Sequence, residues 1–219
     1  MLGPNGCGKS TLLRTLAGLQ PALGGTYNLT PSLQGRPGEA SKHIALVLTE
    51  RLSMDNTTVH DVVALGRYPY TSFLDGLTDE DEAIIADALQ QVGFSPAPKG
   101  EGWEGASTFF NAHSDGEKQR ILIAKALAQQ TPIILLDEPT AHLDLPHRIL
   151  ILRLLRRLAH EQGKTILIST HELDLALALS DRILLMTPGK GVQLDTAENL
   201  KKADAFTSAF GMDIFSPLG

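Results

Sequence analysis

This sequence of 219 residues has a single cysteine, no long apolar run and no excess of positive charge. The single cysteine excludes an internal disulfide and fits a reducing compartment. The longest apolar runs, such as Ile133–Leu136 and Ile183–Met186, are far too short to span a bilayer. The net charge of −6 argues against nonspecific binding to nucleic acid, so we expect no nucleic-acid partner. The opening residues are unlike a signal peptide, and we expect a soluble, cytosolic protein.

A glycine-rich segment opens the sequence. It reads Gly3-Pro4-Asn5-Gly6-Cys7-Gly8-Lys9-Ser10-Thr11 and follows the pattern G-x-x-x-x-G-K-[ST] of a phosphate-binding loop. Its glycines let backbone N–H groups surround phosphate oxygens, and the following helix directs its positive dipole end at the same anion. In this pattern Lys9 lies against the β and γ phosphates, and the Ser10 hydroxyl binds Mg²⁺. The sequence therefore predicts a site for a nucleoside triphosphate and Mg²⁺.

Short, almost entirely apolar segments recur along the chain, as expected for strands that are buried on both faces of a parallel sheet. The expected strands are Ile44–Leu48, Ile133–Leu136, Thr165–Ile168 and Ile183–Leu185. The expected helices between them are Ser10–Leu19, Glu117–Gln130 and Pro146–Gln162. This alternation, together with the loop, predicts an α/β fold with a P-loop NTPase core and a mostly parallel sheet.

The middle third of the sequence has a different character. Between about 57 and 112 we expect helices at Val59–Leu65 and Asp79–Val92 but no buried strand. The acidic run Asp79–Glu82 lies in the first turn of the second helix, where the dipole favours it, and we expect it to face solvent. The Pro/Gly-rich stretch Ser95–Gly105 is typical of an exposed loop. We therefore predict a helical insertion within the α/β core.

Two adjacent carboxylates, Asp137 and Glu138, follow the apolar segment Ile133–Leu136. Side chains alternate along a strand, so neighbouring acids at one strand end can serve different tasks. Asp137 would hold Mg²⁺, and Glu138 would take a proton from an attacking water or position that water. The alternative is a strand that becomes polar where it meets solvent, but the phosphate-binding loop in the same chain favours the metal site.

Two further polar segments stand at the ends of expected elements. His171 follows the segment Thr165–Ser169, and because parallel strands share one carboxyl edge, we expect His171 and Glu138 to approach the same phosphates. Ser114 and Glu117 have the spacing of a capping box, in which each side chain bonds to the other residue's backbone N–H. A helix N-terminus is also an anion site, but on spacing alone this segment is only a cap.

Taken in order, these motifs resemble those of the ATP-binding subunit of ABC transporters, over nearly the whole chain. Gly3–Thr11 is similar to the Walker A motif, and Ile133–Glu138 to Walker B with its catalytic glutamate. Ala141–Asp144 resembles the D-loop, His171 the switch histidine, and Ser114–Glu117 the signature motif. The resemblance implies that the chain binds ATP and Mg²⁺ and hydrolyses ATP to drive transport.

The resemblance also implies an assembly and a domain organisation. Two subunits would bind head to tail as a homodimer, so that Ser114 and Gly116 of one contact the ATP held by the other, with Asp144 close by. One ABC-type ATPase domain would comprise residues 1–219, with a helical subdomain carrying the signature motif at 57–118. The implied partner is a transmembrane permease, which would hold the subunit peripherally at the cytoplasmic side of the cell membrane.

A narrower similarity concerns the cargo. Ala64-Leu65-Gly66-Arg67-Tyr68-Pro69 resembles a stretch found in importers of iron-siderophores, haem and cobalamin, and Ala126-Leu127-Ala128-Gln129 fits the same group. This similarity indicates uptake of a metal chelate. The alternative is an ordinary helix that ends at a proline-containing turn.

The sequence departs from the family pattern at two sites. Thr49, followed by Glu50, stands where the family has a glutamine that senses Mg²⁺ and couples the site to the membrane subunit. Glu50 could bind the metal more strongly than an amide but adds negative charge near phosphate, so we predict it as a third metal ligand and expect altered Mg²⁺ dependence. Asp115 and Glu117 replace a glycine and a glutamine of the signature motif. We expect the nucleotide site to tolerate these two acids, because capping turns Glu117 towards its own backbone.

A phosphate-binding loop normally follows a buried strand, and here only Met1 and Leu2 precede it. We expect that N-terminal strands are missing from this chain or that the true start lies upstream. Without that strand the core sheet would have unpaired backbone groups and exposed apolar faces. We therefore expect weak ATP binding and poor solubility for residues 1–219.

Two alternative functions stay open at this point. A noncatalytic or truncated nucleotide-binding subunit is favoured by the absent strand but opposed by the intact Lys9, Asp137, Glu138 and His171. A nonmembrane ABC ATPase acting on ribosomes or DNA is opposed by the negative charge and the metal-chelate segment. The basic cluster Arg153, Arg156 and Arg157 is better explained as a solvated helix face.

Overall fold

The computed structural model describes residues 1–25, 40–48, 54–71, 76–94 and 108–211. The predictions for Thr49, Glu50 and Ser95–Gly105 concern residues outside these ranges.

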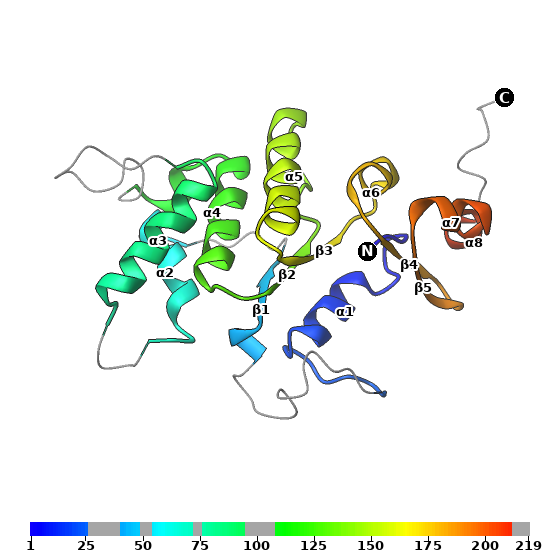
Figure 1. Ribbon diagram of the computed structural model, residues 1–219, viewed down its shortest axis with the longest axis horizontal. Helices are drawn as coiled ribbons and strands as arrows, with labels where there is room; N and C mark the ends of the chain where they lie inside the picture. Colours follow the sequence, from blue (N-terminus) through cyan, green and yellow to red (C-terminus); the bar gives the residue numbers. More distant parts are fainter. Residues whose placement is uncertain (26–39, 49–53, 72–75, 95–107, 212–219) are drawn as a thin grey trace.

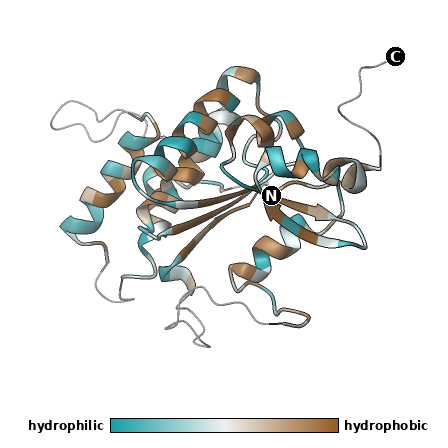
Figure 2. Cartoon of the chain, turned by 45° about the vertical axis from the view of Figure 1, so that its right-hand side comes forward, coloured by the Kyte–Doolittle hydropathy of each residue, from teal (hydrophilic) through white to brown (hydrophobic). Residues whose placement is uncertain are grey.

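Three strands form a parallel sheet at the centre of the molecule: β1 (Ile44–Val47), β2 (Ile133–Asp137) and β3 (Thr165–Ser169) (Figure 1). Their order is β1-β2-β3, and the register places Asp137 opposite Ser169 at the carboxyl edge. Figure 2 shows hydrophobic residues along these strands. The three apolar segments thus become parallel strands, as predicted. β1 and β2 are mostly buried, whereas in β3 only Ser169 is buried.

The fourth expected strand differs from the other three. β4 (Ile183–Thr187) pairs antiparallel with β5 (Gly191–Asp195), a strand that the sequence analysis missed. A tight turn reverses the chain between them, with Lys190 N–H bonded to the Thr187 carbonyl and positive φ at Gly189 and Gly191. Most of β5 is exposed, so it lacks the continuous apolar character that marks the buried strands.

Met1 and Leu2 lie between β3 and β4. Leu2 forms parallel bridges with Thr170 on one side and Leu185 on the other, and it is fully buried. Its N–H donates to the Leu184 carbonyl at 2.9 Å, and its own carbonyl accepts from Met186 N–H at 2.8 Å. Backbone hydrogen bonds therefore join these two residues to both neighbours, where the short N-terminal segment had led us to expect a gap in the sheet.

Helices cover the sheet. α1 (Lys9–Leu16) follows the glycine-rich loop, and α4 (Asp115–Ala128) and α5 (Leu145–His160) bracket β2 in the sequence. α2 (Val59–Ala64), the 3₁₀ turn η2 (Leu65–Arg67) and α3 (Asp79–Gln91) pack with α4 at the left of Figure 1. One hydrophobic cluster includes residues of α2, α3, α4, α5 and the sheet. The helical insertion thus shares its core with the sheet, and the boundaries 57–118 stay a prediction.

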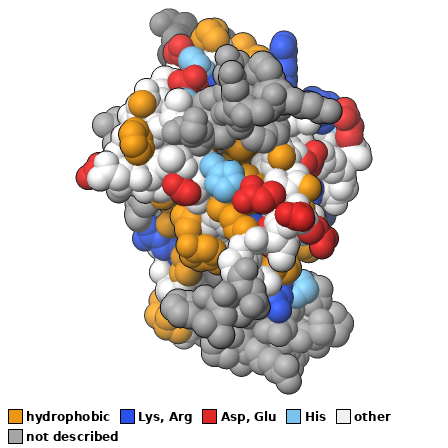
Figure 3. Space-filling view, turned by 90° about the vertical axis from the view of Figure 1, so that its left-hand side faces the viewer, with side chains coloured by type: hydrophobic (Ala, Val, Ile, Leu, Met, Phe, Trp, Pro, Cys, Tyr) orange, Lys and Arg blue, Asp and Glu red, His pale blue; other side chains and the backbone are white. Residues whose placement is uncertain are grey.

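The acidic start of α3 behaves only partly as expected. Asp79, Glu80 and Glu82 are exposed, but Asp81 is buried and paired with Arg67. On the outer face of α2 and α3, acidic side chains lie beside a histidine (Figure 3), and His60 Nε2 is 2.8 Å from Glu82 Oε2.

The remaining elements were not predicted from the sequence. They are α6 (Leu173–Leu179), α7 (Ala197–Lys202), α8 (Ala205–Phe210) and the 3₁₀ turns η1 (Ala40–Lys42) and η3 (Phe110–Ala112). Leu200 of α7 and Phe206 of α8 join Leu2 and Leu185 in a second hydrophobic cluster. The short C-terminal helices therefore pack against the segment that leads into the glycine-rich loop. Across the described residues, no helix is long and apolar enough to cross a bilayer.

Candidate active site

The glycine-rich loop is closed around its own lysine. Gly6 and Gly8 have φ angles of 78° and 97°, in the left-handed region that favours glycine. Lys9 is only 6% exposed, and its Nζ donates to the carbonyl oxygens of Gly3 at 2.9 Å and Pro4 at 3.2 Å. The ammonium group is thus held inside the loop, where phosphate oxygens would compete for it. The remaining predicted loop residues lie on the same segment: Asn5 and Cys7 before α1, and Ser10 and Thr11 in its first turn.

Backbone pairing brings this loop to the carboxyl edge of the central sheet. Leu2, just before the loop, pairs with Thr170, which directly precedes His171. A Cβ atom at Gly3 would lie 2.8 Å from the Met186 carbonyl oxygen, so the close approach to β4 requires glycine there. The backbone that leads into the loop therefore lies next to the backbone that leads into His171.

A single hydroxyl group joins the two acidic residues at the end of β2. Ser169 Oγ donates to Asp137 Oδ1 at 2.5 Å and accepts from the Glu138 N–H at 2.9 Å. The same N–H also lies 3.1 Å from the Ser169 carbonyl oxygen. Ser169 is fully buried and Asp137 is 6% exposed. Ser169 was not among the predicted site residues, because its place opposite Asp137 follows only from the pairing of β2 with β3.

Glu138 and His171 lie side by side, and their shared approach to the phosphates stays a prediction. His171 Nδ1 is 3.2 Å from Glu138 Oε1, and the exposed fractions of the two side chains are 48% and 26%. Glu138 has a φ of 43°, in the left-handed region that non-glycine residues rarely occupy. Such strained backbone persists where surrounding contacts hold it, and the Ser169 oxygens that accept from the Glu138 N–H supply those contacts.

The donor set at this edge fits Mg²⁺ together with a nucleotide. Mg²⁺ binds oxygen ligands and is usually held by one or two carboxylates plus substrate phosphates and water. Asp137 would supply a carboxylate and Ser10 a hydroxyl, and phosphates would complete the shell. Within the described ranges, no cluster of three or more His, Cys, Asp or Glu side chains forms a separate metal site. Glu50, the third predicted ligand, lies outside those ranges.

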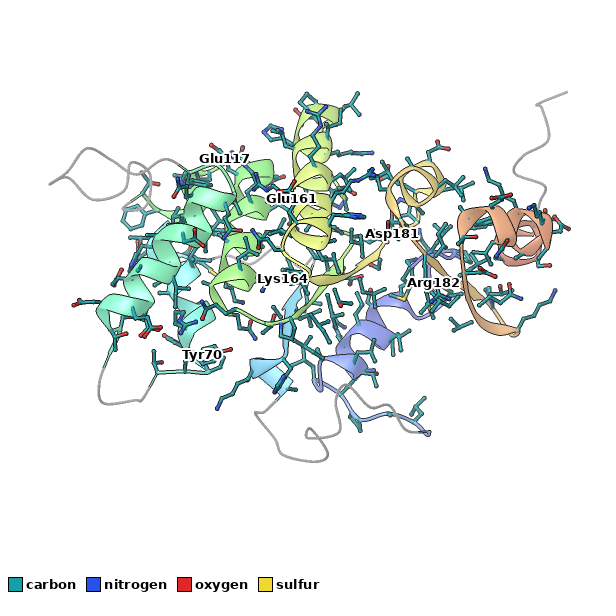
Figure 4. The ribbon with its side chains drawn as sticks, viewed as in Figure 1. Tyr70, Glu117, Glu161, Lys164, Asp181 and Arg182 are labelled. Atoms are coloured by element: carbon teal, nitrogen blue, oxygen red, sulfur yellow. The ribbon has the colours of Figure 1, made fainter. Side chains whose placement is uncertain are left out.

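The predicted signature motif forms the capping box that its spacing indicates. Glu117 Oε2 accepts from the Ser114 N–H at 2.9 Å and from Ser114 Oγ at 2.7 Å. These hydrogen bonds, with the Ser114 hydroxyl contributing most, hold the pKa of Glu117 below its usual value. The expectation that Glu117 faces its own backbone is confirmed. Glu117 lies at the start of α4 in Figure 4, and Tyr70 lies near the opposite end of that helix.

Gly116 is covered by a side chain from the start of α5. A Cβ atom at Gly116 would lie 2.5 and 2.6 Å from two ring atoms of His147. His147 also contacts Asp144, which caps α5 by accepting from the His147 N–H at 3.2 Å. The hydrogen bond with the His147 side chain is the largest cause of a lowered Asp144 pKa. His147 therefore connects the predicted D-loop to the predicted signature motif within one chain.

The segment similar to metal-chelate importers packs tightly against the end of α4. A Cβ atom at Gly66 would lie 2.3 Å from the Lys125 carbonyl oxygen, so only glycine fits. The buried Arg67 donates to Asp81, to the Ala128 carbonyl and to the Gln130 side chain. Tyr70 OH donates to the Gln129 carbonyl, and its ring lies 4.4 Å from the Arg67 guanidinium carbon. These residues hold the helical insertion to α4.

A glycine-rich loop at a helix N-terminus, beside paired carboxylates at the carboxyl edge of a parallel sheet, defines a P-loop nucleoside triphosphatase. A family model described as "ABC transporter" matches residues 1–141. The chain is 36% identical over 215 residues to the iron(3+)-hydroxamate import ATP-binding protein FhuC of Bacillus subtilis, covering 97% of this chain and 77% of that relative.

Two solved structures have similar folds. A chain of a "metal-chelate type ABC transporter" in an inward-facing conformation superposes with a TM-score of 0.82 at 29% identity, covering 96% of this chain and 76% of that one. The ATP-binding cassette MJ0796, in a dimer bound to ADP and Pi, gives 0.70 at 27% identity, covering 89% and 83%. This chain belongs to the ABC transporter family and is one of its ATP-binding, ATP-hydrolysing subunits.

Proposed function

We propose that this ATPase energises import of an iron-siderophore or a related metal chelate. The similar FhuC protein is named for import of iron(3+)-hydroxamate, and the similar solved transporter for a metal chelate. The Gly66-Arg67-Tyr68-Pro69 segment resembles a stretch of the same group of importers, and this resemblance supports the proposal.

The reaction is attack of water on the γ-phosphate of ATP. Glu138 acts as the base that accepts or orients the proton of the attacking water, and His171 orients the γ-phosphate. Lys9 and the backbone N–H groups of the loop stabilise negative charge on the transferred group. Ser10 and Asp137 would hold Mg²⁺, which neutralises charge on the phosphate oxygens when it is bound. The observation that carries this assignment is the 3.2 Å approach of His171 Nδ1 to Glu138 Oε1.

The active unit is a head-to-tail homodimer docked on a transmembrane permease. Ser114 and Gly116 of one subunit complete the nucleotide site of the other, and Asp144 lies at the same contact. The dimeric cassette bound to ADP and Pi supports pairing of two such chains. Through the permease, the dimer is peripheral to the cytoplasmic side of the cell membrane, and the cargo is bound elsewhere in the transporter.

Uptake measurements with the assembled transporter test the cargo. The chain is co-purified with its permease and reconstituted in vesicles with ATP on the cassette side, and movement of a radioactive ferric hydroxamate is followed. We expect ATP-dependent uptake that is lost with Glu138→Gln. Haem and cobalamin serve as parallel arms within the same chelate class. ATP hydrolysis without uptake or chelate-stimulated turnover in any of the three arms contradicts import of a metal chelate.

A further inference from the structure

Arg148, in the first turn of α5, joins two segments that are far apart in the sequence. Its Nε donates to the Leu143 carbonyl oxygen at 2.7 Å, within the predicted D-loop. Its Nη1 donates to Glu172 Oε2, also at 2.7 Å, and Glu172 directly follows His171. The planar guanidinium group holds its N–H donors in a fixed, forked arrangement, so one side chain can make both hydrogen bonds with good geometry.

The bond to Glu172 takes the place of an ordinary helix cap. Glu172 is the N-cap residue of α6, a position where Ser, Thr, Asp or Asn commonly accepts from the helix N–H groups, but the Glu172 side chain makes no cap hydrogen bond. The carboxylate is turned to Arg148 instead. The Arg148 and Glu172 side chains are 33% and 26% exposed, so solvent screens this charge-assisted pair only in part.

The residues on both sides of His171 are therefore anchored. Thr170 N–H donates to the Met1 carbonyl at 2.9 Å, and Glu172 N–H donates to Thr170 Oγ1 at 3.0 Å. The His171 side chain is 48% exposed, so neighbouring side chains enclose it little. The position of its imidazole relative to Glu138 depends mainly on how the backbone at 170–172 is held.

We propose that Arg148 is a positioning residue for His171. By bonding Glu172 and the Leu143 carbonyl together, it keeps the imidazole within reach of Glu138 and ties the switch-histidine segment to the D-loop. A displacement of the D-loop is thereby transmitted to His171. The proposal rests on the proposed function insofar as Glu138 and His171 act in hydrolysis, but the geometric link can be tested without ATP.

Histidine resonances of the nucleotide-free chain give the first readout. The chain has seven histidines, and the His171 signal is the one that disappears in His171→Gln. We expect Arg148→Ala and Glu172→Ala to shift this signal alike, and the double variant to shift it no further, because both substitutions break one bond. Arg153→Ala is the matched control, since Arg153 is an exposed arginine on the same helix. Glu172→Gln keeps the size of the side chain and serves if the alanine variants fold poorly.

Steady-state hydrolysis gives the second readout. We expect Arg148→Ala to lower kcat about tenfold with KM for ATP nearly unchanged, because a misplaced catalytic group slows the reaction more than it weakens substrate binding. Arg148→Lys keeps the positive charge but lacks the forked guanidinium group, so its kcat should lie between those of the wild type and Arg148→Ala. An unshifted His171 signal in folded Arg148→Ala and Glu172→Gln overturns the proposal. Wild-type turnover in His171→Gln instead refutes the proposed role of His171, while the resonance shifts still decide the positioning.

Discussion

Ser169 Oγ donates a hydrogen bond to Asp137 Oδ1 over 2.5 Å, and the same oxygen accepts from the backbone of Glu138. One buried hydroxyl thus orients the predicted metal ligand and holds the strained backbone of the predicted base. Groups that orient metal ligands commonly matter nearly as much as the ligands themselves.

Ser169→Ala should therefore raise the Mg²⁺ concentration needed for half-maximal hydrolysis about tenfold. The substitution removes the Ser169 Oγ hydrogen bond to Asp137 Oδ1 and one of the two acceptors of the Glu138 N–H. The measurement is a Mg²⁺ titration of ATPase activity, with the exposed Ser180→Ala as control. An unchanged titration would show that the hydroxyl does not organise the metal site.

Gly116→Ala should destabilise the chain by about 2 kcal/mol, because the added methyl group would meet the His147 ring and force a shift. Urea unfolding of the nucleotide-free protein measures this effect. Combining it with His147→Ala should bring the stability back to that of His147→Ala alone. If the double variant stays as unstable as the sum of the two single variants, the packing of His147 on Gly116 is not what requires glycine there.

Asp81→Asn should destabilise the fold by about 3 kcal/mol, since it leaves the buried Arg67 without its charged partner. The exposed Asp79→Asn in the same helix turn is the matched control and should change little. Equilibrium urea unfolding of the two variants measures the difference.

The hydrogen bonds of Asp81 also predict that the stability of the fold depends on pH. Hydrogen bonds from Thr78 and Arg67 lower the pKa of Asp81 from its ordinary value of 3.8 to about 2. Because the folded-state pKa is the lower one, the stabilisation is complete well above 3.8 and is lost as the pH falls from about 4 towards 2. Asp81→Asn should flatten this part of the stability profile, and a profile parallel to that of the wild type would contradict the assignment.

Glu138→Gln should trap an ATP-bound dimer, because we expect ATP still to bind while the proposed base for water attack is removed. Size-exclusion chromatography with light scattering measures the mass with ATP, and with ADP as the control nucleotide. A folded variant that stays monomeric in saturating ATP would contradict the head-to-tail pairing through Ser114 and Gly116.

Local patterns predicted much of the fold. The nearly all-apolar segments around Ile44, Ile133 and Thr165 became parallel strands, and the capping pair Ser114 and Glu117 formed as its spacing required. In these places one local signal determines the structure: either a continuous apolar segment or a fixed hydrogen-bond spacing.

The features that were missed depend on contacts between segments distant in sequence. Exposed β5 is held mainly by its pairing with β4, and α7 and α8 are too short for a clear helical period. Asp81 looks like one of four solvated acids until Arg67 is placed beside it. Ser169 and Arg148 gain their partners only when β2, β3 and α5 come together, so no local pattern could reveal them.

In the proposed site, the opening loop and three distant side chains surround one Mg²⁺-bound ATP. A crystal structure of Glu138→Gln with Mg²⁺ and ATP tests this arrangement most directly. We predict that Lys9 Nζ leaves the carbonyls of Gly3 and Pro4 for the β and γ phosphates, with Asp137 at the metal and His171 at the γ-phosphate. Nucleotide bound elsewhere, with Lys9 still bonded to those two carbonyls, would refute this arrangement of the site.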